Sequence, residues 1–304
     1  MRRMNPQLLA VDWGTSSLRG ALLDAQGQVL DERRADRGLL SVEPGTWGAV
    51  FDQHFGAWMQ QWPRLRCLMA GMVGSRQGWV EAPYAACPAS LADLAQALRW
   101  VQPGRVAIVP GMSCQQHGVP DVMRGEETQA FGALQLLGLE EATLVLPGTH
   151  SKWVQVAGGR VQHFATHMTG ECYALLRRQS LLARSLPAQA GPLLEADFDA
   201  GVARAQQPGG LLHHLFGVRA MGLFGQRTDA SLESYLSGLV IGEELRAQRA
   251  IDPAAGTVPV VLIGAPALTD RYRRALASLC VDAVAVGAEA GWLGLLALAA
   301  TIDA

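Results

Sequence analysis

A glycine turn with hydroxyl side chains, placed directly after an apolar run, is the first feature of this sequence that suits phosphate binding. The run 8–11 leads into Asp12, Gly14, Thr15 and Ser16. A glycine lets backbone N–H groups approach phosphate oxygens, and the hydroxyls can donate to the same oxygens. The Asp12 carboxylate can hold Mg²⁺ directly or through water. The turn therefore predicts a nucleotide triphosphate site, although an ordinary β-hairpin turn explains the same residue types.

The same arrangement returns in the C-terminal half of the chain. An apolar strand over 143–146 leads into Gly148 and Thr149, and two further strands are expected within 153–164. Residues 7–36 have the same expected order of strand, turn, strand, turn, strand. This repeat predicts two α/β domains of one topology, each with a phosphate-binding hairpin.

Hydrophobic periodicity predicts the elements that must position these turns. The expected helices are 46–62, 89–100, 126–138, 168–179, 231–249, 268–279 and 289–300, and the further strands are 65–70, 106–109, 258–263 and 283–286. Residues 71–79 and 112–121 are expected to be loops, and 184–210 to hold short helices. Three glycines in 71–79 predict a close backbone approach there, and Gly238 with Gly242 predicts one on the long helix.

Composition narrows the class of protein. Of 304 residues, 49% are hydrophobic and 17% charged, and the formal net charge is -2. A globular chain with scattered basic residues is expected, without a nucleic-acid partner. No apolar run suits a signal peptide or a membrane span, so a cytoplasmic protein is expected. Five widely spaced cysteines indicate neither disulfides nor zinc, and His163 with His167 lacks a third metal ligand nearby.

Seven blocks spread over nearly the whole chain resemble the 2-dehydro-3-deoxygalactonokinase family of the sugar kinase/Hsp70/actin superfamily. The blocks are 10–14, 69–75 with 78–79, 82–84, 122–129, 147–154, 168–171 and 237–239. The resemblance implies duplicated ribonuclease H-like (actin-like ATPase) domains, 1–139 and 140–304, with a nucleotide cleft between them. It also implies ATP-dependent phosphorylation of 2-dehydro-3-deoxy-D-galactonate at its terminal hydroxyl, with Mg²⁺, in D-galactonate breakdown.

The resemblance also implies roles for individual residues. Asp12 would hold the metal and take part in catalysis. The phosphate-binding candidates are Gly14, Thr15, Ser16, Gly148, Thr149 and His150, and the adenosine-binding candidates are Gly264 and Ala265. The sugar-acid candidates are Gly74, Ser75, Trp79, Arg124, Lys152 and Glu171. Two departures from the superfamily pattern, Pro147 for Asp and Ala265-Pro266 for glycine, leave Mg²⁺ coordination to Asp12.

The general base is sought among two adjacent glutamates. In the superfamily the base is a carboxylate near a helix start, followed by small residues. Glu126 fits that place, because Ala130 and Gly132 follow it, and Glu127 is the second choice. This chain departs from the superfamily pattern here, with Glu in place of Asp and a longer reach. Alternatively, both glutamates only complement the helix dipole.

Three other functions stay open. The chain could phosphorylate another sugar or sugar acid, because substrate loops decide this. A non-catalytic sugar-sensing regulator would need a DNA-binding segment, for which a first strand at about residue 7 leaves no room. A chaperone-like ATPase would need a peptide-binding domain. The sequence leaves the oligomeric state open, a homodimer among the alternatives.

Overall fold

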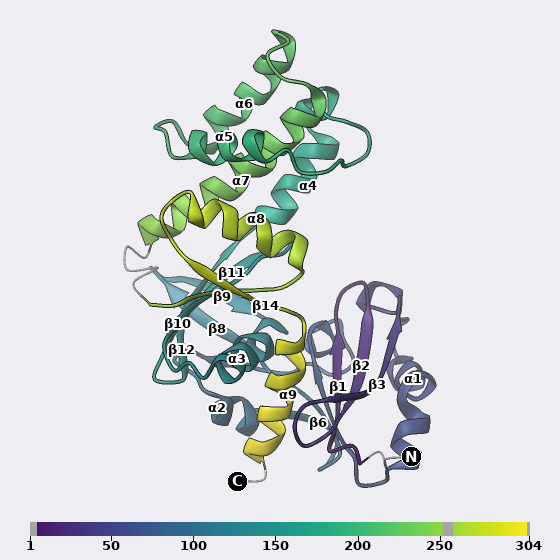
Figure 1. The fold of residues 1–304 in the computed structure, drawn as a ribbon. Coiled ribbons are helices and arrows are strands. Elements are labelled where there is room, and N and C mark those ends of the chain that lie inside the picture. Colours follow the sequence, from purple (N-terminus) through teal and green to yellow (C-terminus); the bar gives the residue numbers. More distant parts are fainter. Residues whose placement is uncertain (1–4, 252–257, 303–304) are drawn as a thin grey trace. The chain divides into compact units, whose positions relative to one another are not determined.

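Three sheets organise residues 5–251 and 258–302, which the computed structural model describes (Figure 1). The strands are β1 (Leu8–Trp13), β2 (Leu18–Leu23), β3 (Val29–Ala35), β4 (Arg66–Ala70), β5 (Tyr84–Ala86), β6 (Arg99–Gln102), β7 (Val106–Ile108), β8 (Gly111–Gln116), β9 (Val119–Met123), β10 (Ala142–Leu146), β11 (Ser151–Ala157), β12 (Arg160–His167), β13 (Val260–Ile263) and β14 (Ala283–Val286).

The helices lie between these strands and after them. They are α1 (Trp47–Gln61), α2 (Leu91–Gln96), α3 (Glu126–Leu137), α4 (Thr169–Gln179), α5 (Glu195–Ala205), α6 (Gly210–Leu223), α7 (Asp229–Ile251), α8 (Pro266–Ala277) and α9 (Glu289–Ile302), with 3₁₀ helices at Leu39–Ser41, Met72–Gly74 and Leu181–Ser185. Among the described residues, none of these helices is both long and apolar enough to cross a membrane.

The first two sheets share one strand order, which is the structural form of the predicted repeat. The first sheet runs β3-β2-β1-β4-β7-β6, and the second runs β12-β11-β10-β13-β14. In each, an antiparallel meander is followed by a strand that pairs in parallel with the first strand of the meander, β4 with β1 and β13 with β10. The carboxyl ends of β1 and β4 therefore lie at one edge of the first sheet, next to the Asp12 turn.

The chain forms two compact units. Unit 1 consists of residues 1–142, 154–164 and 286–304, and unit 2 of 143–153 and 165–285. Unit 1 has a core built around the aromatic side chains Trp13, Trp47, Phe51, Phe55 and Trp58. Unit 2 has two cores along α7, one shared with α5 and α8 and one with α6. The predicted division near residue 139 stays a prediction.

Close helix contacts in both units depend on glycine. In unit 2, a Cβ on Gly238 of α7 would lie 1.9 Å from the Phe198 carbonyl oxygen of α5, and one on Gly242 would lie 2.9 Å from the Val202 Cα. The predicted close approach at these two glycines is therefore confirmed. In unit 1, a Cβ on Gly132 of α3 would lie 1.7 Å from the Ala290 carbonyl oxygen of α9. This crossing fixes α3, the helix that begins with the two glutamates.

Residues 112–121 are not the polar loop that was predicted. They form most of the hairpin β8–β9, which pairs with β5 in the third sheet. The two residues between the strands, His117 and Gly118, both have positive φ, 50° and 80°. Two such residues make the turn type that matches strand twist in tight hairpins. Polar side chains concealed the hairpin because most of its positions are partly or fully exposed.

The predicted helix 89–100 is also wrong in its second half. Helix α2 ends at Gln96, and Arg99–Gln102 form strand β6, which pairs antiparallel with β7 at the sheet edge. Ser90 begins α2 through a capping box with Asp93, in which the Ser90 N–H and hydroxyl both donate to Asp93 Oδ2 at 2.7 Å. The short helices expected within 184–210 are the end of the 3₁₀ helix Leu181–Ser185 and α5, and the sequence did not predict α6, which begins at Gly210.

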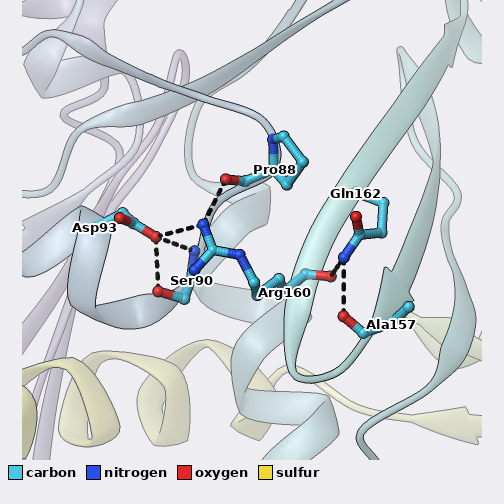
Figure 2. Close-up of polar contacts among 6 residues, drawn as sticks. All are labelled: Pro88, Ser90, Asp93, Ala157, Arg160 and Gln162. Carbon is cyan, nitrogen blue, oxygen red and sulfur yellow. Dashed lines mark hydrogen bonds and ion pairs between the residues drawn. The ribbon is translucent and has the colours of Figure 1, made fainter.

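Arg160 links strand β12 to the start of α2 within unit 1 (Figure 2). Its Nη2 donates to the Pro88 carbonyl oxygen at 2.7 Å and lies 3.2 Å from Asp93 Oδ2. Ala89 and Val161 exchange backbone hydrogen bonds of 3.0 and 2.9 Å beside it. The side chains of Arg160 and Asp93 are about two-fifths exposed, so the backbone pairing is the stronger part of this link.

Candidate active site

The first phosphate turn carries its hydroxyl groups at the surface of unit 1, while the Leu39 and Leu40 N–H groups donate to the Gly14 and Thr15 carbonyls. Gly14 N–H donates to the Ser17 carbonyl at 2.9 Å, and Thr15 and Ser16 are exposed. A Cβ on Gly14 would meet only the Ser17 carbonyl oxygen, at 3.8 Å. Packing within the chain therefore does not require glycine at this position, and a ligand can approach the backbone there.

Asp12 stands beside this turn at the end of β1, as predicted. Its carboxylate forms an ion pair with Arg19 of β2, and its side chain is 32% exposed. The Arg19 guanidinium lies over the Trp292 ring of α9, 5.6 Å from the centroid. Sequence reasoning missed Arg19, which orients Asp12 from the neighbouring strand.

The glycine-rich loop after β4 approaches Asp12 and the start of α3. Gly71 has φ +95°, and a Cβ there would lie 2.8 Å from the Trp13 carbonyl oxygen and 3.4 Å from Asp12 Oδ1. Gly125, which precedes α3, packs on Gly71 in turn, since its Cβ would lie 3.2 Å from the Gly71 Cα. The close approach predicted for 71–79 is thus to the strand end that carries Asp12 and to the helix that begins at Glu126.

Arg124 lies under the same loop with much of its hydrogen-bonding capacity unused. Its Nη2 donates to the Ala82 carbonyl at 2.9 Å, and its guanidinium lies 4.3 Å from the Tyr84 ring centroid. A Cβ on Gly74 would lie 2.6 Å from Ile108 Cγ2 and 3.0 Å from Arg124 Nη1, so the loop packs closely on both side chains. Arg124 Nε and Nη1 and the Ser75 hydroxyl are buried without a hydrogen-bond partner among the described residues. Such groups are costly to bury alone, which points to a ligand that accepts hydrogen bonds.

The two glutamates at the start of α3 have different surroundings. Glu127 is fully buried and accepts the Gly125 N–H on both oxygens, at 2.9 and 2.7 Å. Burial, with the nearby Glu126 charge, raises the pKa of Glu127 from 4.5 to about 8. Glu126 is only partly buried and accepts the Arg124 N–H at 3.0 Å. Both side chains thus cap the helix start, and Glu126 is the more accessible of the two.

Trp79 contributes to the core of unit 1. Its ring packs against Phe51 and Trp13, with centroids 5.6 and 6.4 Å away. It is partly buried at the end of the loop that contains Gly74 and Ser75. Its predicted contact with the sugar acid stays a prediction.

The second phosphate turn belongs to unit 2 and is held by the start of α4. Glu171 N–H donates to the Thr149 carbonyl at 3.0 Å, and a Cβ on Gly170 would lie 2.3 Å from the Gly148 carbonyl oxygen. His150 Nε2 lies 2.6 Å from Glu171 Oε2, so these two predicted residues form a polar pair. A Cβ on Gly148 itself would meet nothing within 4 Å. Lys152 is buried on β11.

The predicted adenosine turn lies next to this second turn. Gly264 has φ +151°, and its Cβ would lie 3.8 Å from the Pro147 carbonyl oxygen. Ala265 is exposed at the N-cap of α8. The two turns end the neighbouring parallel strands β10 and β13, as the repeat requires.

A cavity of about 270 Å³ opens beside these turns within unit 2. Its walls come from the second turn, from the start of α4, and from facing sides of α7 and α8. The lining residues are Gly148, Thr149, Thr169, Gly170, Tyr173, Ser237, Val240, Ile241, Leu268, Arg271 and Tyr272. This size is close to the lower end of small-molecule sites, roughly 300–1,000 Å³. Apolar side chains with a few polar groups suit a nucleoside, and phosphates fit at the glycine turn.

Arg271 is one of the residues that line this cavity. Its Nη1 donates to the Ser237 hydroxyl at 3.0 Å. Together with Tyr173 and Ser237 it also lines a second, more polar cavity of about 190 Å³. Sequence reasoning missed this wall of the site, although Ser237 lies in one of the resembling blocks.

The structure therefore groups the predicted residues within each unit. In unit 1 it brings together Asp12, the loop that holds Gly74 and Ser75, Arg124 and Glu126. In unit 2 it brings together Gly148, Thr149, His150, Glu171 and Gly264. No group of three or more His, Cys, Asp or Glu side chains suited to a metal ion occurs in the described part of the chain.

Known proteins resemble this chain over nearly its full length. The family profile described as 2-keto-3-deoxy-galactonokinase matches residues 12–298. The chain is 34% identical over 287 residues to the 2-dehydro-3-deoxygalactonokinase of Escherichia coli (strain K12), covering 94% of each chain. It is 38% identical over 300 residues to a protein of Rhizobium meliloti (strain 1021) assigned the same activity, covering 96% of each.

Solved structures agree as well. A crystal structure of a candidate 2-dehydro-3-deoxygalactonokinase from Sinorhizobium meliloti has a TM-score of 0.89 at 37% identity, over 97% of this chain and 99% of that one. A candidate N-acetylglucosamine kinase from Porphyromonas gingivalis has a TM-score of 0.53 at 14% identity, over 96% and 99%. The latter likeness shows the fold alone, which is the actin-like ATPase fold. The chain belongs to the 2-keto-3-deoxy-galactonokinase family.

Proposed function

We propose that this chain transfers the terminal phosphoryl group of ATP to the terminal hydroxyl of 2-dehydro-3-deoxy-D-galactonate, in D-galactonate breakdown. The observation that carries the choice of substrate is the buried Arg124 guanidinium, whose Nε and Nη1 have no partner among the described residues. A sugar acid offers an anionic carboxylate that accepts charge-assisted hydrogen bonds from this cation, whereas a neutral sugar does not. The Ser75 hydroxyl, equally without a partner there, would be a third donor.

The nucleotide is assigned to the Gly148–Thr149 turn and to the cavity of unit 2. Open space at Gly148 leaves its backbone accessible to phosphate oxygens. The apolar walls formed by Val240, Ile241 and Leu268 suit the base and ribose. Gly14, Thr15 and Ser16 supply the corresponding donors on unit 1. Because ATP is the phosphoryl donor, we expect the reaction to take place in the cytoplasm.

The donor set of unit 1 fits Mg²⁺ in the way that phosphate enzymes bind it. Mg²⁺ is usually bound by one or two carboxylates together with substrate phosphates and several waters. Asp12 supplies one partly exposed carboxylate, kept in place by Arg19. When bound, the ion neutralises charge on the phosphates. We therefore assign Asp12 to the metal, and no other carboxylate to it.

Glu126 is assigned as the general base. Phosphoryl transfer needs little more from the protein than positioning, charge neutralisation and a group that accepts the proton of the acceptor hydroxyl. Glu126 lies next to Arg124 in the chain and is more accessible than Glu127. A substrate whose carboxylate binds Arg124 would be held in the same part of unit 1 as Glu126. Glu127, buried with a raised pKa, is assigned to the structure of the helix start.

A substrate panel tests the substrate class. Turnover with ATP and Mg²⁺ is measured on 2-dehydro-3-deoxy sugar acids, aldonic acids and neutral sugars. We expect kcat/KM to be highest for 2-dehydro-3-deoxy-D-galactonate. A higher value for a neutral sugar would contradict the assignment of Arg124 and favour another sugar kinase. No turnover on any member would favour a sugar-sensing regulator.

A cavity-filling variant tests the nucleotide site. Leu268 lines the cavity and is only partly buried, so Leu268→Trp fills the space with little cost to the core. It should weaken ADP binding by about tenfold or more, a loss typical of displacing a ligand group from its pocket. Leu268→Met is the matched control and should bind ADP as the wild type does. Equal ADP affinity in both variants would place the nucleoside elsewhere.

A further inference from the structure

A single buried carboxylate connects three hydrogen-bond donors in unit 2. Glu244 of α7 is 3% exposed. Its Oε1 accepts the Trp153 indole N–H at 2.7 Å. Its Oε2 accepts the Tyr272 hydroxyl at 2.6 Å and also the Thr169 hydroxyl. Tyr272 additionally lies 2.9 Å from the Ser151 hydroxyl. Five buried side chains thus form one network, which is costly unless every member is satisfied.

The members of this network come from the elements that build the cavity. Thr169 and Tyr272 are themselves cavity walls, at the start of α4 and on α8. Ser151 and Trp153 belong to β11, the strand that directly follows the Gly148–Thr149 turn. Burial and the nearby Glu244 raise the pKa of Tyr272 well above its usual value, so this hydroxyl keeps its proton and donates.

We infer that Glu244 is a positioning residue for the nucleotide: it fixes the cavity walls at Thr169 and Tyr272 relative to the strand that follows the second phosphate turn. The inference rests on the proposed nucleotide site. Glu244 does not line the cavity, so it would act through its three donors and not by touching the ligand. It would therefore govern nucleotide affinity and leave the sugar-acid site of unit 1 unaffected.

Glutamine at position 244 keeps the shape of the side chain but cannot accept hydrogen bonds from all three donors. A carboxylate offers acceptors on both oxygens, whereas an amide offers one oxygen and an NH₂ group that only donates. The indole N–H of Trp153 can only donate, so the amide oxygen would remain its acceptor. The NH₂ group would then face Thr169 and Tyr272, both of which donate there now. Each hydroxyl would have to turn away, and both cavity walls would lose their shared acceptor.

The test compares Glu244→Gln with Glu243→Gln in the full chain. Glu243 is the adjacent residue and pairs with Arg246 on the same helix at 2.5 Å, so it is a matched control outside the network. Calorimetry gives the Kd for ADP, and steady-state kinetics give the KM values for ATP and for 2-dehydro-3-deoxy-D-galactonate. We expect Glu244→Gln to raise the Kd for ADP and the KM for ATP about tenfold, as for loss of a hydrogen bond to a charged group.

The KM for the sugar acid should change less than about twofold, and Glu243→Gln should resemble the wild type throughout. A residue with a merely structural role would lower the active fraction without this split between the two KM values. An unchanged Kd for ADP, or equal rises in both KM values, would overturn the inference. If Leu268→Trp still weakens ADP binding in that case, the nucleotide site stands and only the role of Glu244 falls.

A milder variant keeps the inference falsifiable if Glu244→Gln does not fold. Tyr272→Phe removes one hydroxyl that is buried and bonded only within the network. It should raise the Kd for ADP about threefold, which corresponds to one ordinary hydrogen bond. Tyr235→Phe, another buried tyrosine of unit 2, is its control. Equal Kd values for these two variants would overturn the inference.

Discussion

Replacing Glu126 and Glu127 one at a time by glutamine separates catalysis from helix capping at the start of α3. Glutamine keeps the size of each side chain and an oxygen that can accept the backbone N–H of Arg124 or Gly125. It removes the ability to take up a proton. If Glu126 is the general base, Glu126→Gln should lower kcat by about 10²–10⁴-fold. Glu127→Gln should change kcat far less, because that side chain is fully buried.

The raised pKa of Glu127 should instead make the free energy of unfolding depend on pH. Its pKa is raised from 4.5 to about 8 in the folded chain. Between these values the folded state holds a proton that the unfolded state has released, so stability is greatest below pH 4.5 and falls as the pH rises towards 8. Each pH unit in this window costs about 1.4 kcal/mol. From pH 5.5 to 7.5 the wild type should therefore lose about 3 kcal/mol that Glu127→Gln does not lose.

Two assays measure these expectations. Steady-state kinetics with saturating ATP give kcat for both variants, and urea unfolding at several pH values gives the two stability profiles. Glu127→Gln should flatten the slope of stability against pH, whereas Glu126→Gln should keep most of it, because burial raises the pKa of Glu127 more than the Glu126 charge does. Parallel slopes for the wild type and Glu127→Gln would refute the raised pKa. A large loss of kcat in Glu127→Gln with a small one in Glu126→Gln would reverse the choice of base. Small losses in both would return the pair to a purely capping role.

Three further substitutions test the remaining assignments. Asp12→Asn removes the charge assigned to Mg²⁺ and should abolish most turnover without unfolding, and turnover within about threefold of wild type at saturating Mg²⁺ would contradict it. Arg124→Lys keeps the charge but loses the planar fork, so the KM for the sugar acid should rise by about tenfold or more while the KM for ATP changes little; equal effects would instead place Arg124 at the nucleotide. Gly148→Ala adds a methyl group into open space, so it should leave thermal unfolding unchanged and raise the KM for ATP, and Gly217→Ala, another glycine with open space, is its control. A KM for ATP that matched the control would remove the Gly148 turn from the nucleotide site.

The features that could be predicted from the sequence are those that depend on neighbouring residues in the chain. The meander 7–36, its repeat around Gly148 and the strand ends next to Asp12 follow from apolar runs and glycine turns, and the structure confirms them. The role of Arg124 was indicated by its place in the block 122–129 and by the need of a sugar-acid carboxylate for a cationic partner. The difference in burial between Glu126 and Glu127 could not be predicted, because the sequence shows only two identical neighbouring residues at one helix start.

The features that were missed depend on contacts between distant residues. The cavity in unit 2 is formed by side chains of α4, α7 and α8, and Arg271 and Tyr272 follow no turn or motif that would single them out. The hairpin β8–β9 was missed because polar side chains cover a strand pair whose faces are partly exposed. The second half of the predicted helix 89–100 became β6 because β7 offers it an edge to pair with. Tertiary pairing overrides local propensity in such segments.

The glycines of the site divide into two classes. Gly71 and Gly170 have backbone or side-chain atoms where a Cβ would stand, so the fold itself requires them. Gly14 and Gly148 do not: a Cβ at the first would make an ordinary contact and at the second none. Neither packing nor a positive φ requires glycine at these two positions in the unliganded chain, which also holds for Gly217 of α6, outside the site. Gly14 and Gly148 both lie in the turns assigned to phosphate, where close approach of a ligand to the backbone supplies a reason for glycine.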